Sequence, residues 1–163
     1  MPDRHNKLYY MAPMTQAPLI YAFGIFSYNG IKERPKIDEY RFSIADPSVN
    51  DKREETKVGG RWLHDYVPLY WATHTPMQYD VTVKYRILPE DELIFFEFWS
   101  EHTLAIEGVW TTDGNAVSLE TQKFPGTGAI EHIDWDIIDN PKCISPEWKR
   151  KKHAEVLVPD HLA

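Results

Sequence analysis

The sequence predicts an α+β fold built on a strongly aromatic sheet. Residues 77–88 alternate apolar and polar side chains, and residues 92–99 are almost continuously apolar, so both runs have strand character. Aromatic residues make up 13% of the chain, and its 12 prolines favour many bends over long helices. At 163 residues the chain fits one domain, 1–163, long enough to bury a core.

The first elements are predicted to be a strand and then a helix. Lys7–Met11 is β-prone and is followed by the breaker Ala12-Pro13. Residues 15–23 have a helical pattern, with Thr15 as the expected N-cap and Gly24 as the stop signal.

The next stretch is mostly polar. Asn29-Gly30 is a turn signal. Residues 32–57 are predicted to be a long polar loop that contains one apolar island, Arg41–Ala45, and a turn or cap before residues 49–55.

Strands are predicted to dominate after residue 76. The run at 77–88 turns into the run at 92–99, which is expected to be central in its sheet because it is so apolar. Residues 104–110 are predicted as a third strand, ended by a turn cluster at 111–115.

The C-terminal part is predicted to contain a helix and a final strand. Residues 133–138 fit either a short helix or a strand, and Ser145 is the expected N-cap of a helix that begins with proline. Ala154–Val158 is an apolar strand that carries one acid, Glu155. That acid is either exposed on an edge, paired with Arg150 or a neighbouring lysine, or engaged in chemistry.

The stretch Gly59–Tyr79, GGRWLHDYVPLYWATHTPMQY, is too irregular for a helix and too aromatic for a plain loop. Its Asp65 is predicted to tie backbone N–H groups, and His64 and His74 to be satisfied core imidazoles. Its large aromatics either stack a ligand or fill the core; they are Trp62, Tyr66, Tyr70 and Trp71.

Charge and motifs exclude several functional classes. The net charge of −7 gives no global signal for nucleic acid or membrane, so any nucleic-acid contact must be local. The seven histidines lack the close spacing of metal ligands, and Walker-type, GxSxG and strand-linked GxGxxG motifs are absent. With the single Cys143, no apolar run of 18 residues and no signal-peptide pattern, the expected location is cytoplasmic.

Five separated motifs resemble the DarT family of toxin ADP-ribosyltransferases. The central stretch is similar to the family's LHDYVPFYF run with its Ser-Pro-Met-Leu-Tyr ending. The others, in chain order, are Gly24–Asn29 (Gly-x-x-Ser-x-Asn), Thr112–Ala116 (TDGNA), Ile133–Trp135 (Leu-Asp-Trp) and Lys149–Val158 (KRxxxAEFLV).

This resemblance implies an ADP-ribosyltransferase fold, which is a split mixed sheet with an NAD cleft between its halves. It also implies an activity, the transfer of ADP-ribose from NAD to a base of single-stranded DNA, with RNA as an open alternative. It implies NAD as co-substrate, no metal, no membrane, and a macrodomain antitoxin as the partner that restrains the toxin. Glu155 falls on the family's catalytic glutamate, Arg53 on or next to its catalytic arginine, and Lys52 where many members have a second arginine.

The resemblance also assigns binding residues. The family's His-x-Thr-His motif falls on residues 10–13 and its following asparagine on Gln16, so NAD is expected at Tyr10, Met11, Ala12 and Gln16. The arginine before its Ser-Pro-Met falls on His74, which joins Tyr70 and Trp71 as expected substrate-binding residues.

These residue types suit the implied chemistry. A carboxylate can stabilise the charge that develops as the nicotinamide–ribose bond breaks, and an arginine stays charged at any working pH. Two alternatives remain: a catalytically inactive nucleic-acid or protein-binding module on the same fold, favoured by the altered residues 10–13 and an expected shorter C-terminus, and a transferase for protein side chains.

Overall fold

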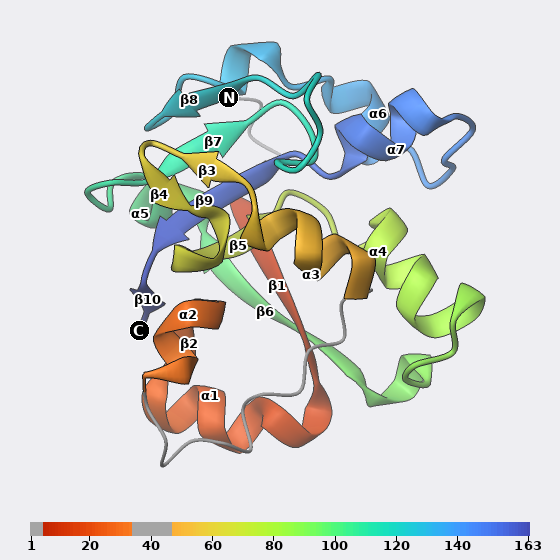
Figure 1. The fold of residues 1–163 in the computed structure, drawn as a ribbon. Helices are drawn as coiled ribbons and strands as arrows, with labels where there is room; N and C mark the ends of the chain where they lie inside the picture. Colours follow the sequence, from red (N-terminus) through yellow and green to blue (C-terminus); the bar gives the residue numbers. More distant parts are fainter. Residues whose placement is uncertain (1–4, 34–46) are drawn as a thin grey trace.

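A six-stranded sheet forms the centre of the computed structural model, which describes residues 5–33 and 47–163 (Figure 1). The strands of this sheet, in spatial order, are β6 (Leu93–Trp99), β1 (Lys7–Pro13), β5 (Tyr66–Tyr70), β9 (Glu155–Pro159), β7 (Trp110–Thr112) and β8 (Lys123–Pro125). Every pair of neighbouring strands in it is antiparallel. The α+β class is confirmed, with antiparallel pairing throughout this sheet where a mixed sheet was expected.

Two short antiparallel ladders flank this sheet. They pair β2 (Ile25–Phe26) with β10 (His161–Leu162) and β3 (Lys57–Val58) with β4 (Arg61–Trp62). The first ladder holds the last described strand against the segment that follows the first helix (Figure 1).

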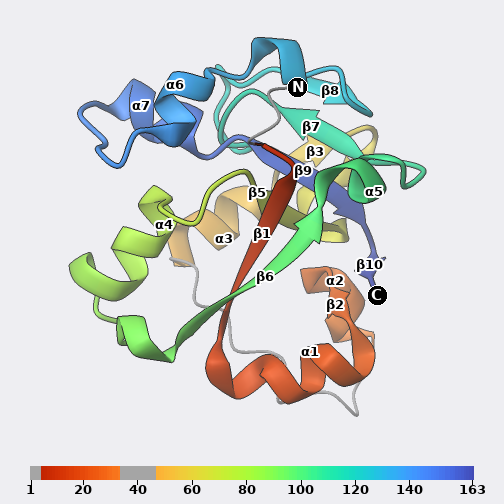
Figure 2. The ribbon, with the colours of Figure 1, turned by 180° about the vertical axis from the view of Figure 1, so that it is seen from behind.

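Short helices connect the strands. The α-helices are α1 (Ala17–Phe23), α2 (Tyr28–Lys32), α3 (Pro47–Glu54), α4 (Pro76–Tyr79), α5 (Ser100–Leu104), α6 (Trp135–Asp139) and α7 (Pro146–Lys152). The 3₁₀ turns are η1 (Met14–Gln16), η3 (Leu63–Asp65), η5 (Glu90–Glu92) and η6 (Ile130–His132), and η4 (Asp80–Lys84) is a π-helix. Both views place α1 and α2 at one end of the molecule and α6 with α7 at the other (Figures 1 and 2).

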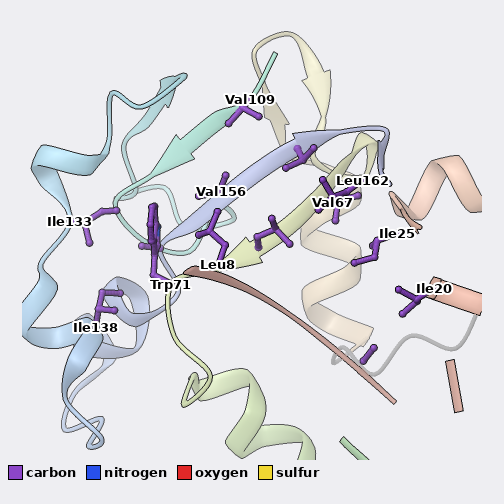
Figure 3. Close-up of a cluster of buried hydrophobic side chains, with 14 residues drawn as sticks. Leu8, Ile20, Ile25, Val67, Trp71, Val109, Ile133, Ile138, Val156 and Leu162 are labelled. Atoms are coloured by element: carbon purple, nitrogen blue, oxygen red, sulfur yellow. The ribbon is translucent and has the colours of Figure 1, made fainter. Parts of the chain in front are cut away.

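The main core lies where β1, β5 and β9 run side by side. Leu8, Val67 and Val156 come from these three strands and are fully buried (Figure 3). Ile20 and Leu162 extend this cluster toward α1 and β10. Because a central antiparallel strand is covered on both faces, β9 carries four consecutive buried residues.

Several sequence predictions are confirmed. Strands occur at Lys7–Pro13, Leu93–Trp99 and Glu155–Pro159. Gly24 ends α1 with a φ of 79°, a left-handed conformation that glycine adopts without a Cβ penalty. The Ser145 hydroxyl accepts a hydrogen bond from the Trp148 N–H at 3.2 Å and so caps α7.

The prediction of a strand at residues 77–88 was wrong, because this run forms α4 and the π-helix η4. Thr75 caps α4 by accepting from Gln78 N–H at 3.2 Å, and proline takes the first helical position. The apparent alternation is not a burial pattern: Val81 is 2% exposed whereas Val83 is 53% exposed. The capping signals at the start of α4 favour a helix here, and the alternation of apolar and polar residues is coincidental.

Other predicted elements also differ. Residues 104–110 contain the end of α5 and a turn, so the strand begins only at Trp110. Asn29-Gly30 lies inside α2, because the Ser27 hydroxyl caps that helix by accepting from Gly30 N–H at 3.0 Å. Thr15 is not an N-cap, since η1 precedes α1 and Gln16 takes the cap position.

Two questions about the elements could be decided only from the tertiary structure. The run at 93–99 is an edge strand and not a central one, with mostly half-buried side chains. Residues 133–138 resolve into a helix, α6, capped by Asp134. Arg41–Ala45 lies outside the described residues, and no helix among those that are described is long and apolar enough to cross a membrane.

Candidate active site

A cleft of about 380 Å³ opens between the central strands and the helices on one side of them. Its floor comes from β1, β5 and the start of β9. One wall comes from α2, α3 and η3, and the opposite wall from α4, η4 and α7. Segments far apart in the chain therefore meet at one concave surface of a size suited to a small ligand.

The cleft contains a buried ion pair between Arg53 and Glu155. Glu155 is the first residue of β9 and is 1% exposed, and Arg53 in the last turn of α3 is 8% exposed. The guanidinium Nη1 lies 3.3 Å from Oε1 and 3.1 Å from Oε2 of Glu155, and Nη2 lies 3.2 Å from Oε2. This forked contact fixes both side chains in one geometry.

A backbone group also holds the Glu155 carboxylate, because its Oε1 accepts a hydrogen bond from Ala116 N–H at 3.0 Å. The backbone N–H of Glu155 donates to the Thr112 hydroxyl at 2.9 Å. Burial by itself lowers the pKa of Arg53, but the neighbouring Glu155 carboxylate outweighs it, so the pKa of Arg53 is raised. The guanidinium is therefore a permanent cation beside the carboxylate.

Tyr70 lies next to this pair on the floor of the cleft. It is the cross-strand neighbour of Glu155 in the β5–β9 ladder, and Tyr9 of β1 faces it on the other side. Burial and the negative charge of Glu155 raise the pKa of the Tyr70 phenol, so it stays protonated at neutral pH. A neutral hydroxyl is thus available beside the carboxylate.

His153 connects the far wall of the cleft to its floor. Its Nε2 accepts a hydrogen bond from the Met77 N–H at 3.1 Å, and its ring meets the Tyr70 ring edge-on at 6.0 Å. Burial lowers the pKa of His153 to about 4, so the imidazole is neutral at pH 7. An ion pair of 3.2 Å between Lys149 and Asp80 adds a second link between α7 and η4.

The Leu-His-Asp turn η3 supports the near wall. As predicted, Asp65 ties a backbone group: its carboxylate accepts from Trp62 N–H at 3.0 Å, and also from Asn29 Nδ2 at 2.7 Å. His64 is buried as predicted, but neither of its ring nitrogens has a hydrogen-bond partner among residues 5–33 and 47–163, so it is not a satisfied imidazole there. Its ring lies 4.4 Å from that of Tyr28.

The structure brings six of the ten predicted site residues to this cleft: Tyr10, Met11, Gln16, Arg53, Tyr70 and Glu155. Their roles remain predictions, but they converge from five elements: β1, η1, α3, β5 and β9. Glu155 is neither on an edge strand nor paired with Arg150, so the two non-catalytic interpretations of this acid were wrong.

The other four predicted residues lie outside the cleft. Ala12 is 1% exposed within the main core, and Trp71 is 3% exposed and packs edge-on against Trp135 at 5.2 Å. Lys52 points to solvent because successive helix residues face different directions. His74 is exposed in the loop after β5, so the predicted core imidazole was also wrong there.

Some cleft residues had no assigned role in the sequence. They are Tyr28, Asn50, Asp80, Asn115, Lys149 and His153. Three of them had a usable signal, since Asn115 lies in the Thr112–Ala116 motif and Lys149 and His153 lie in the Lys149–Val158 motif. The remainder come together only through tertiary packing. Among residues 5–33 and 47–163, no group of three or more His, Cys, Asp or Glu side chains could hold a metal ion.

Comparison with known proteins gives consistent matches. A family model described as "ssDNA thymidine ADP-ribosyltransferase, DarT" matches residues 9–163. A DNA ADP-ribosyl transferase of Thermus sp. (strain 2.9) is 30% identical over 124 residues, which cover 71% of this chain and 59% of that protein. A DNA ADP-ribosyl transferase–DNA ADP-ribosyl glycohydrolase fusion protein of Thermosipho africanus (strain H17ap60334) is 32% identical over 120 residues, covering 73% and 29%. The chain thus spans less than two thirds of either relative.

Solved structures share the fold. Thermus sp. 2.9 DarT in complex with ADP-ribosylated ssDNA superimposes with a TM-score of 0.82 at 23% identity, covering 96% of this chain and 76% of that one. Thermosipho africanus DarTG in complex with ADP-ribose gives a TM-score of 0.83 at 28% identity, covering 96% and 41%. This chain therefore shares its overall fold with these structures.

Proposed function

This chain belongs to the DarT family, and from that membership we propose that it transfers ADP-ribose from NAD to a thymidine base in single-stranded DNA. The observation that carries the proposal is the buried Arg53–Glu155 pair on the floor of the cleft. In the sequence resemblance, Glu155 falls on the family's catalytic glutamate and Arg53 falls on or next to its catalytic arginine. A carboxylate at 1% exposure, held by an arginine and a backbone N–H, is preorganised for electrostatic work.

The cleft suits a dinucleotide. Its volume of about 380 Å³ fits within the usual range of ligand pockets, and its floor offers both apolar and polar groups. Tyr10 and Met11 supply apolar surface on β1, and Gln16 supplies an amide at the end of that strand. These are the residues we propose for contact with NAD.

In the proposed reaction the bond between the ribose C1′ and the nicotinamide nitrogen breaks, and a bond from C1′ to the acceptor base forms. Nicotinamide leaves as a neutral molecule, and the acceptor base releases one proton. Glu155 opposes the positive charge that develops on the ribose, and it does so without reorganising because Arg53 and Ala116 already fix it. Excluding water from this buried carboxylate strengthens that interaction.

The test is mass analysis of DNA. Purified protein with NAD should add one ADP-ribosyl group to a single-stranded oligonucleotide that contains thymidine. A matched oligonucleotide without thymidine and the same sequence as a duplex serve as controls, because a base inside a stack is out of reach. If a folded sample leaves the thymidine strand unmodified, the proposal fails.

A binding module without catalysis is the second candidate. Residues 10–13 lack the imidazoles and hydroxyl of the family motif, and of these residues Tyr10, Met11 and Pro13 line the cleft. Calorimetric titration with NAD separates the two, since an inactive module without an NAD site gives no heat. Measurable NAD binding would therefore speak against this second candidate.

We further propose that a DNA ADP-ribosyl glycohydrolase restrains this protein as an antitoxin. The relative from Thermosipho africanus joins both activities in one chain, which supports the pairing of a transferase with its reversal. Expression of the chain alone should arrest bacterial growth, and co-expression of a DNA ADP-ribosyl glycohydrolase should relieve the arrest. Growth that is unaffected by active protein would contradict the toxin role.

A further inference from the structure

His64 has an unusual environment for a buried histidine. It lies on η3 in the near wall of the cleft and is 5% exposed, yet neither ring nitrogen has a hydrogen-bond partner in the part of the chain that the structure describes. Two other buried histidines are at least half satisfied: His5 Nε2 lies 2.7 Å from Asp139, and His153 Nε2 accepts from Met77 N–H. An unpartnered buried polar group lowers stability, so its retention calls for a compensating role.

The ring offers a neutral donor and a neutral acceptor. Burial lowers the pKa of His64, and the positive charge of Arg53 lowers it further. At neutral pH the imidazole therefore has one N–H and one lone pair. The surrounding charges are mixed, since Arg53 and Lys32 lower the pKa of His64 whereas the carboxylates of Glu54 and Asp65 raise it. Such balanced surroundings suit an uncharged partner better than a phosphate.

A ribose hydroxyl has the matching chemistry, because it also donates and accepts. Helix α3, which carries Arg53, packs against η3, which carries His64, and both residues line the cleft. The ring therefore lies at the end of the cleft that holds the Arg53–Glu155 pair. That is the end where, in the proposed reaction, the ribose that carries nicotinamide must lie.

Tyr28 is the group that shields His64. Its ring lies 4.4 Å from the imidazole with a tilt of 34°, and the residue is 41% exposed on the five-residue helix α2. Because much of this ring already faces solvent, it can rotate outward and open the imidazole without disturbing the main core.

We propose that His64 is a ligand-binding residue of the cleft and hydrogen-bonds a hydroxyl of the ribose that carries nicotinamide in NAD. This assignment rests on the proposed function for its ligand. It predicts that His64 has opposite effects on stability and on binding. Its unpartnered nitrogens destabilise the protein without ligand, and the same nitrogens bind the ligand.

The test replaces His64 by phenylalanine, which keeps a flat ring and removes both unpartnered nitrogens. The His64→Phe variant should melt at a higher temperature than the wild type and bind NAD about tenfold more weakly, as expected for one lost hydrogen bond. A His64→Gln variant retains a donor and an acceptor and should recover part of the affinity. Trp71→Phe is the matched control, because it removes another buried, unpartnered nitrogen outside the cleft and should leave NAD affinity unchanged.

Calorimetric titration with NAD, ADP-ribose and ADP completes the experiment. The affinity loss of His64→Phe should appear with NAD and ADP-ribose and be absent with ADP, which lacks the second ribose. Equal NAD affinity of wild type and His64→Phe, or an equal loss with ADP, overturns the assignment while leaving the proposed function intact. A wild-type protein that binds no NAD overturns both, and one that binds NAD but never modifies DNA overturns only the proposed transfer.

Discussion

The Glu155→Gln substitution gives the sharpest test of the buried pair. Glutamine keeps the size of the side chain and an oxygen that can still accept from Ala116 N–H. It removes the negative charge, so Arg53, at 8% exposure, is left as a buried cation without its counter-ion. Both stability and activity should therefore fall, for different reasons.

The size of the stability loss follows from the geometry. Three nitrogen–oxygen contacts between 3.1 and 3.3 Å join the two side chains, and breaking a buried pair from one side costs about 3–5 kcal/mol. For a chain of this length, that loss corresponds to a decrease in melting temperature of roughly 6–20 °C. The double variant Arg53→Met/Glu155→Gln has no charge left at these two positions, so it should regain much of this stability.

Thermal and urea denaturation of the wild type, both single variants and the double variant measure this coupling, and mass analysis of thymidine-containing DNA measures activity. Every variant should be inactive, although the double variant is well folded. An equal stability of Glu155→Gln and the wild type would refute the electrostatic argument. Retained ADP-ribosylation by Glu155→Gln would remove this residue from the mechanism.

Three further substitutions or conditions give definite expectations. The pKa of His153 is about 4 in the folded chain and about 6.5 in the unfolded chain, so the unfolded chain binds the proton first as the pH falls. The free energy of unfolding should therefore fall by about 3 kcal/mol between pH 6.5 and 4 and then level off. The difference between wild type and His153→Gln in urea titrations isolates the contribution of His153. Gly59→Ala should lower the melting temperature more than Gly60→Ala does. Both positions have left-handed φ values, so both substitutions strain the backbone. Only at Gly59 would the added Cβ also clash, because it would lie 2.6 Å from the Trp110 ring, whereas a Cβ at Gly60 would have no other atom within 4 Å among the described residues. Ser145→Ala should cost about 1 kcal/mol in urea denaturation because α7 loses its N-cap bond, and an unchanged midpoint would contradict that role.

Local signals in the sequence predicted those elements whose ends carry specific chemistry. Gly24 as a stop and Ser145 as a cap depend on backbone conformation and one nearby hydrogen bond, so a short window suffices to recognise them. The same kind of signal, Thr75 before Pro76, was present at the start of α4, but the alternation in the following residues concealed it. Periodicity fails there because it records residue type and not burial.

The motifs of the sequence, and their resemblance to one family, were enough to single out Glu155 and Arg53 and to predict the fold class. Only the tertiary structure decided which other residues join them, since β1, α3, β5 and β9 are distant in the chain and meet through strand pairing. It moved Trp71 and Ala12 into the core and opened the cleft beside Tyr70. The physical reason is that a side chain's type is a local property, whereas its burial, its partners and its charge environment depend on residues that only folding brings near.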